Sequence, residues 1–148
     1  MLSSRNRIKD MSEKQKLAII ISDQKDVGSC LSFQLEQYYE VKIYMTTETA
    51  EKDLYKGDIK PDIIIMDIFI ERETCIEICN RIRLKLDKNE YPIMVITWGF
   101  NIDGSIETNK DTINKILDAG ANNVLHQRPF DHEDLLECVF ITINNAQK

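Results

Sequence analysis

Polar side chains that could carry out phosphoryl chemistry follow three apolar runs of the sequence. Asp23 follows the run LAIIIS, Asp67 follows IIIM, and Thr97 follows IMVI. Two neighbouring carboxylates suit Mg²⁺, because this ion prefers oxygen ligands and keeps several of its waters. A carboxylate beside such an ion can also attack a phosphoryl group as a nucleophile. These residues therefore predict a magnesium-assisted phosphoryl site, provided that the fold brings them together.

A fourth apolar segment, residues 124–126, is followed by Gln127, Arg128 and Pro129. An arginine can pair with a phosphoryl group through two parallel hydrogen bonds. Each of these polar residues alone is most simply interpreted as an ordinary loop side chain after a strand. Their joint placement after four of the expected strands favours a site.

The apolar pattern predicts five buried strands that alternate with five helices, which is typical of an α/β fold with a parallel sheet covered on both faces. In such open sheets the ligand crevice lies at the carboxyl ends of the strands, where the polar residues above would meet. We expect the strands at residues 17–22, 40–45, 62–69, 93–97 and 124–126, and the helices at 26–35, 47–55, 77–86, 112–118 and 131–143. Thr47 or Thr49 is expected to cap the second helix and Gly57 to end it.

The composition of the 148-residue chain indicates one globular domain, since 43% of residues are hydrophobic and 30% are charged. A net charge of −6 argues against general binding to nucleic acid or to anionic membranes. The apolar runs are too short to span a bilayer, and residues 1–16 are polar with no signal-peptide pattern. We therefore expect a cytoplasmic protein with a polar tail over residues 1–16.

The four cysteines are scattered along the chain and predict free thiols in a reducing compartment. Cys75 and Cys79 are four residues apart, a spacing that would place them on one face of a helix, but the two histidines show no zinc-ligand spacing. Neither a disulfide framework nor a zinc site is expected.

From about Lys16 to Asn144 the sequence resembles the response-regulator receiver domains of two-component signalling, the CheY-like family. The resemblance is carried by five blocks in the family's order, KPDIIIMDIFI, CIEICNRIR, PIMVIT, DAGANNV and RPFDHEDLLECV. It implies a receiver domain over residues 17–146 with a flavodoxin-like (βα)5 three-layer sandwich. Its sheet would be five-stranded and parallel, in the strand order 2-1-3-4-5.

The resemblance also implies roles for individual residues. Asp67 falls on the phosphoacceptor position, and Thr97 falls on the hydroxyl position that contacts the phosphoryl oxygen. Asp23, Asp67 and the backbone carbonyl of Phe69 would hold Mg²⁺. Such a domain is a regulatory phosphoacceptor rather than an enzyme, with at most self-catalysed phosphotransfer and dephosphorylation.

The sequence departs from the family pattern around this site. Ser22 stands where a first acid is usual, so we expect weak Mg²⁺ binding. Trp98 stands where a very small residue is usual, and an indole there would cover the aspartate. Glu71 and Cys75 replace a common proline and glycine, and the segment 98–110 is longer than usual.

The family's lysine before the proline is absent. Alignment on Pro129 gives Arg128 this role and buries His126 and Gln127, whereas alignment on the preceding Gly-Ala pair gives it to Gln127 and buries Leu125 and His126. The aromatic switch position holds Leu125 in the first alignment and Val124 in the second. The resemblance and the Arg-Pro-Phe turn both predict a cis peptide bond at Pro129.

Two functional interpretations remain open at this level. In the first, the chain is a receiver domain that is phosphorylated on Asp67 by a sensor histidine kinase or phosphotransfer protein and binds a downstream protein target. In the second, it is a pseudo-receiver that acts as a protein-interaction module with weak or no phosphorylation. A flavodoxin-like small-molecule binder is disfavoured, because SDQKDVG lacks a glycine-rich phosphate loop.

Protein contact is expected through one face of the domain, which is also a candidate homodimer contact. No direct partner of nucleic-acid or membrane type is expected. Too few residues follow the last helix for a DNA-binding output domain, so we expect either a single-domain regulator or a fragment. The expected face consists of the fourth helix, the fifth strand and the fifth helix, with Asn114, Lys115, Asn123, His126, Glu133 and Glu137 exposed.

Overall fold

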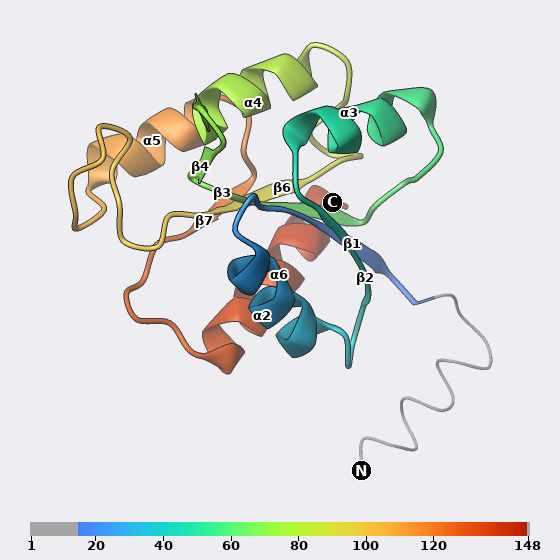
Figure 1. Ribbon diagram of the computed structural model, residues 1–148, viewed down its shortest axis with the longest axis horizontal. Helices are drawn as coiled ribbons and strands as arrows, with labels where there is room; N and C mark the ends of the chain where they lie inside the picture. Colours follow the sequence, from blue (N-terminus) through green and yellow to red (C-terminus); the bar gives the residue numbers. More distant parts are fainter. Residues whose placement is uncertain (1–14, 148) are drawn as a thin grey trace.

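The computed structural model describes residues 15–147, so nearly all of the expected polar tail, residues 1–16, lies outside the described residues. The described chain forms one five-stranded parallel sheet with helices on both faces (Figure 1). The order of its strands is β2-β1-β3-β6-β7, which confirms the order expected from the resemblance. The strands are β1 (Leu17–Ile21), β2 (Glu40–Tyr44), β3 (Ile63–Asp67), β6 (Ile93–Ile96) and β7 (Asn123–Leu125).

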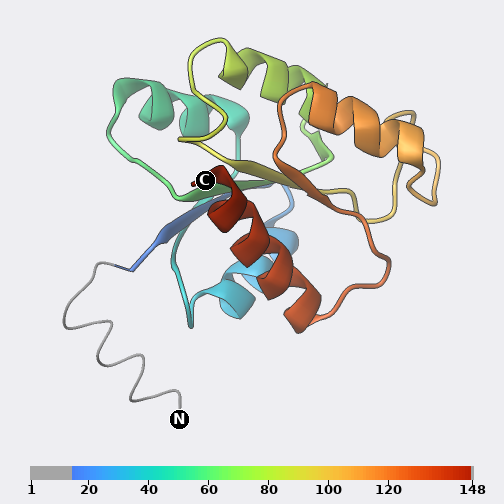
Figure 2. The ribbon, with the colours of Figure 1, turned by 180° about the vertical axis from the view of Figure 1, so that it is seen from behind.

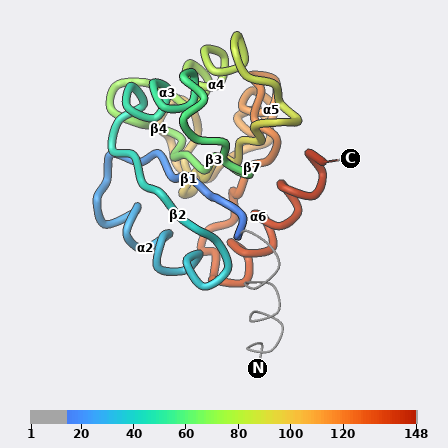
Figure 3. Tube along the Cα trace, turned by 90° about the vertical axis from the view of Figure 1, so that its right-hand side faces the viewer, coloured from blue at the N-terminus to red at the C-terminus, as the bar shows by residue number. Residues whose placement is uncertain are grey.

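The helices form two layers, as the views in Figures 1, 2 and 3 agree. The first layer contains α3 (Thr47–Lys56), α4 (Cys75–Arg83) and α5 (Lys110–Asp118), which pack on one face of the sheet. The second layer contains α2 (Lys25–Leu35) and α6 (His132–Ala146), which pack on the other face. No helix of the described residues is both long and apolar enough to cross a membrane.

The continuous apolar strands are explained by burial on both faces. Ile19 and Ile21 belong to the core beneath α3, α4 and α5, while Ala18 and Ile20 belong to the core beneath α2 and α6. Successive residues of a strand point to opposite faces, so a strand covered on both sides needs apolar residues at every position. The same alternation runs along β3, whose last residue is Asp67.

Local capping moves several helix ends from their expected positions. The cap of α3 is Thr46, not Thr47 or Thr49, because the Thr46 hydroxyl accepts the Thr49 N–H; Gly57 ends the helix as expected, at φ 77°. The third predicted helix begins at Cys75 rather than Glu77, because Thr74 and Glu77 form a reciprocal capping box. A second capping box, Asp131 with Asp134, begins α6.

Two features were not predicted, and both lie near the carboxyl ends of the strands. The first is a short antiparallel hairpin, β4 (Phe69–Ile70) with β5 (Glu73–Thr74), which directly follows Asp67. The second is the segment 99–109, which closes on itself through a bridge between Phe100 and Ile106.

Candidate functional site

Asp67 ends the central strand β3 and is almost enclosed, with 5% of its surface exposed. Its Oδ1 accepts a hydrogen bond from the indole N–H of Trp98 at 2.9 Å. Burial raises the pKa of Asp67, and the nearby charge of Asp23 raises this pKa further, while the Ser22 hydroxyl and the Trp98 indole lower it. The site thus holds an acid that is desolvated and already hydrogen-bonded.

Asp23 lies in the loop after β1, beside Asp67. Its Oδ2 accepts the backbone N–H of Glu71 at 2.7 Å, which joins this loop to the β4–β5 hairpin. Glu71 adopts φ 59°, a left-handed conformation that costs free energy for a residue other than glycine. Sequence reasoning placed Asp23 at the site but gave no signal for this hairpin amide.

Thr97 follows β6 and is completely buried. Its hydroxyl lies 2.9 Å from the Thr108 hydroxyl, and Thr108 itself donates to the Phe100 carbonyl at 3.0 Å. Because a hydroxyl has one proton to donate, Thr97 is the donor in its pair with Thr108. The Gly99 N–H also donates to the Thr97 oxygen at 3.3 Å. The long segment 99–109 therefore holds the hydroxyl that the resemblance assigned to a phosphoryl group.

Trp98 covers Asp67, as its position in the sequence predicted. The residue adopts φ 54°, which is unusual for a bulky side chain, and is followed by Gly99 at φ 85°. Its ring packs against Phe130 with centroids 5.3 Å apart and planes tilted by 44°. The indole therefore connects Asp67 to the loop that leads into α6.

Gln127 and Arg128, the two candidates for the lysine position, are both exposed. They line a surface cavity of about 340 Å³ that Trp98 also lines, and neither hydrogen-bonds to Asp67 within residues 15–147. The Arg128–Pro129 bond is cis, which confirms that prediction. Leu125 is buried as the second alignment expected, but both alignments are wrong to bury His126, and the first is wrong to bury Gln127, because β7 ends at Leu125 and the chain then leaves the sheet. His126 is instead exposed, as expected for the interaction face.

The donor atoms fit a hard divalent cation with few charged ligands. Asp23 raises the pKa of Asp67, so the two carboxylates repel each other, and a cation between them would relieve this repulsion. Ser22 is fully buried and accepts the Gln24 N–H at 3.2 Å, so it contributes a neutral hydroxyl where an acid would add charge. Within residues 15–147 no group of three or more His, Cys, Asp or Glu side chains is placed to hold a metal ion.

Comparisons with known proteins agree on the fold. No family model matches the chain. It is 29% identical over 84 residues to the alkaline phosphatase synthesis transcriptional regulatory protein PhoP of Bacillus subtilis strain 168, a stretch that is 55% of this chain and 33% of PhoP. The chain thus spans about a third of the length of this curated relative.

Solved structures resemble nearly the whole domain. The chemotaxis response regulator CheY4 of Vibrio cholerae has a TM-score of 0.71 at 21% identity, covering 87% of this chain and 99% of its own. A CheY-like receiver domain protein from Methanospirillum hungatei has a TM-score of 0.73 at 19% identity, covering 90% and 98%. A BeF3-activated receiver domain of DrrB has a TM-score of 0.67 at 21% identity, covering 88% and 99%. The chain therefore has the fold of response-regulator receiver domains.

Proposed function

We propose that this chain acts as a receiver domain in two-component signalling, accepting a phosphoryl group on Asp67 with Mg²⁺. The observation that carries the proposal is the placement of Asp67, Asp23 and Thr97 after three adjacent strands of a receiver fold. The phosphodonor would be a sensor histidine kinase or a phosphotransfer protein.

The proposed chemistry uses the Asp67 carboxylate as the nucleophile. An oxygen of Asp67 attacks the phosphorus, the bond from phosphorus to the donor's histidine nitrogen breaks, and that imidazole leaves. Asp23, Asp67 and the Phe69 carbonyl would hold Mg²⁺, which supplies positive charge to the phosphoryl oxygens. Trp98 contacts Asp67 and also lines the cavity of Gln127 and Arg128, so we expect the indole to shift when either side chain approaches the phosphoryl group.

The signalling face proposed for a downstream protein consists of α5, β7 and α6. Within it Asn114, Lys115, His126, Glu133 and Glu137 are exposed, whereas Asn123 is half-buried and donates to the Thr142 hydroxyl at 3.0 Å.

The apolar residues of α6 divide between the core and the surface. Val139 and Ile143 are buried in the core. Leu136 and Phe140 turn toward α2, where they line a cavity of about 320 Å³ with Tyr38 and Tyr39. Phe140 and Ile141 are nonetheless 60% and 42% exposed, so α6 keeps apolar surface that a homodimer contact would bury. Light scattering at high protein concentration, with and without a phosphodonor, tests it, and a strict monomer in both would remove the dimer from the proposal.

A second function, that of a pseudo-receiver interaction module, is favoured by the hydrogen bond from Trp98 to Asp67. Asp67 accepts the Trp98 N–H, Thr97 is hydrogen-bonded to Thr108, and Asp23 accepts the Glu71 N–H. Each of the three expected site residues is thus already hydrogen-bonded within the protein. In this alternative the fold would bind its target without modification of Asp67.

Intact mass spectrometry after incubation with acetyl phosphate and Mg²⁺ separates the two functions. A receiver should gain one phosphoryl group, and the Asp67→Asn variant should gain none. An unmodified wild-type protein, with a folded far-UV circular dichroism spectrum, would leave only the interaction module.

A further inference from the structure

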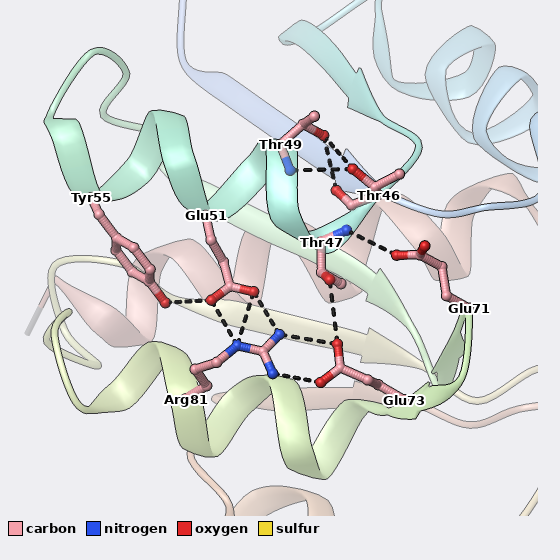
Figure 4. A network of polar contacts seen from close by, with 8 residues as sticks. All are labelled: Thr46, Thr47, Thr49, Glu51, Tyr55, Glu71, Glu73 and Arg81. Atoms are coloured by element: carbon pink, nitrogen blue, oxygen red, sulfur yellow. Dashed lines mark hydrogen bonds and ion pairs between the residues drawn. The ribbon is translucent and has the colours of Figure 1, made fainter.

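The hairpin that follows Asp67 is tied to two helices by one arginine. Arg81, on α4, donates to both carboxylate oxygens of Glu73 on β5, with Nη2 3.1 Å from Oε1 (Figure 4). On its other edge Arg81 donates to Glu51 of α3, with Nε 2.8 Å from Oε1 and Nη2 2.6 Å from Oε2. The guanidinium thus joins the hairpin, α3 and α4 through paired hydrogen bonds, the geometry in which arginine binds carboxylates best.

The same hairpin is also attached to the first residue of α3. The Thr47 hydroxyl donates to Glu73 Oε1 at 3.3 Å, and the Thr47 N–H donates to Glu71 Oε1 at 3.4 Å (Figure 4). Two residues of the hairpin are therefore held from outside the site, Glu71 at its tip and Glu73 at the start of β5.

The inner side of the hairpin contacts the candidate site. The Glu71 N–H donates to Asp23 Oδ2 at 2.7 Å, and Phe69, two residues after Asp67, belongs to the same hairpin. The left-handed φ of 59° at Glu71 orients this N–H, and such a conformation persists only where its surroundings hold it. The contacts of Glu73 and Thr47 supply that support.

The arginine contacts stabilise the hairpin through their number and their partial burial. The pKa of Arg81 is raised by Glu51 first and then by Glu73, and the pKa of Glu73 is lowered by Arg81. The Glu51 side chain is 10% exposed, and those of Glu73 and Arg81 are 30% and 40% exposed. A half-exposed single ion pair contributes little, but a bidentate network in which one arginine serves two carboxylates is geometrically well defined.

We propose that Arg81 is a positioning residue for the candidate site: through Glu73 it fixes the β4–β5 hairpin so that the Glu71 N–H holds the Asp23 carboxylate beside Asp67. The effect of Arg81 on Mg²⁺ binding rests on the proposed function. The hydrogen bond from the Glu71 N–H to Asp23 does not depend on that function. A purely structural role, in which Arg81 only joins α3 to α4, would make Glu51 the partner that matters.

Glu73→Gln and Glu51→Gln form a matched pair, because each removes one carboxylate charge from the same guanidinium and only Glu73 lies on the hairpin. The first readout is the exchange rate of the Glu71 amide proton, measured by NMR on the full chain. We expect this rate to rise about tenfold in Glu73→Gln and to change less than about twofold in Glu51→Gln. Asp23→Ala should raise the same rate, which verifies that the amide reports its bond to Asp23.

The second readout is titration with Mg²⁺ alone, followed by the fluorescence of Trp98, the chain's single tryptophan. We expect the half-saturating Mg²⁺ concentration to rise several-fold in Glu73→Gln and to stay close to wild type in Glu51→Gln. A flat titration of the wild type would count against the proposed magnesium site, and the Glu71 amide would still decide the positioning role. Equal amide exchange in the two variants, or an unchanged rate in Glu73→Gln, would overturn the inference.

Discussion

The hydrogen bond between Trp98 and Asp67 makes the sharpest test of how this site is built. Trp98→Phe removes the indole N–H but keeps an aromatic ring against Phe130, whose centroid lies 5.3 Å from that of Trp98. Hydrogen bonds to charged groups contribute about 1.5–3 kcal/mol, and this one lies at a carboxylate that is only 5% exposed. We expect the bond to contribute about 2 kcal/mol to the free energy of unfolding at neutral pH.

A double-mutant cycle with Asp67→Ala isolates this contribution from the loss of ring area, because the smaller ring is present in both backgrounds. Urea unfolding followed by far-UV circular dichroism would give the four free energies. We expect a coupling of about 2 kcal/mol near pH 7 that shrinks toward about pH 4. The coupling grows with pH because the indole lowers the pKa of Asp67. Loss of the indole raises this pKa further. The Trp98→Phe variant therefore loses more unfolding free energy than wild type as the pH rises. A coupling below about 0.5 kcal/mol would refute the role given to the indole.

Three further variants test separate parts of the site and its scaffold. Asp67→Asn should stabilise the fold at neutral pH. Burial raises the pKa of Asp67, so the unfolding free energy of wild type falls as the pH rises through that pKa. Urea unfolding across about pH 3 to 8 should show that this pH dependence is lost in the variant. Thr108→Val should lower the free energy of unfolding by about 1–2 kcal/mol, since it leaves the buried Thr97 hydroxyl without its acceptor, whereas Thr108→Ser should restore most of it. Gly120→Ala should cost about 1–3 kcal/mol in thermal unfolding, because Gly120 has φ 120° and a Cβ there would lie 2.5 Å from Arg83 Cγ; an unchanged melting temperature would contradict this packing.

The sheet could be predicted from the sequence because burial on both faces leaves a strong signal. The runs around Ile19, Ile64 and Val95 are continuously apolar, and each is a strand packed between two helical layers. The polar residues that end these runs, Asp67 and Thr97, consequently lie at the same edge of the sheet. Apolar runs alone do not determine the order of the strands, which came from the resemblance.

Partners of the site residues could not be predicted, because they depend on the conformation of irregular segments. The segment 99–109 is shaped by Asn101, whose amide nitrogen donates to the Ser105 hydroxyl and to the Glu107 carbonyl, and whose amide oxygen accepts the Asn109 N–H. These contacts bring Thr108 to Thr97, and only the unusual length of the segment indicated that something differed. Likewise the Glu71 amide reached Asp23 through a left-handed residue that no side-chain pattern reveals.

The candidate site is closed by its own side chains and backbone. Asp67 accepts the Trp98 N–H, Asp23 accepts the Glu71 N–H, and Thr97 is held by Thr108. A ligand that competes for these atoms must first break such bonds, so its apparent affinity falls with the population of the open form. If opening costs only the indole bond, about 2 kcal/mol, the apparent affinity for a phosphodonor or cation is about 30-fold below that of an open site. A partner protein that binds the loop containing Phe130, against which the indole packs, could shift this population without touching Asp67. Such a partner would speed the modification of Asp67 without being required for it.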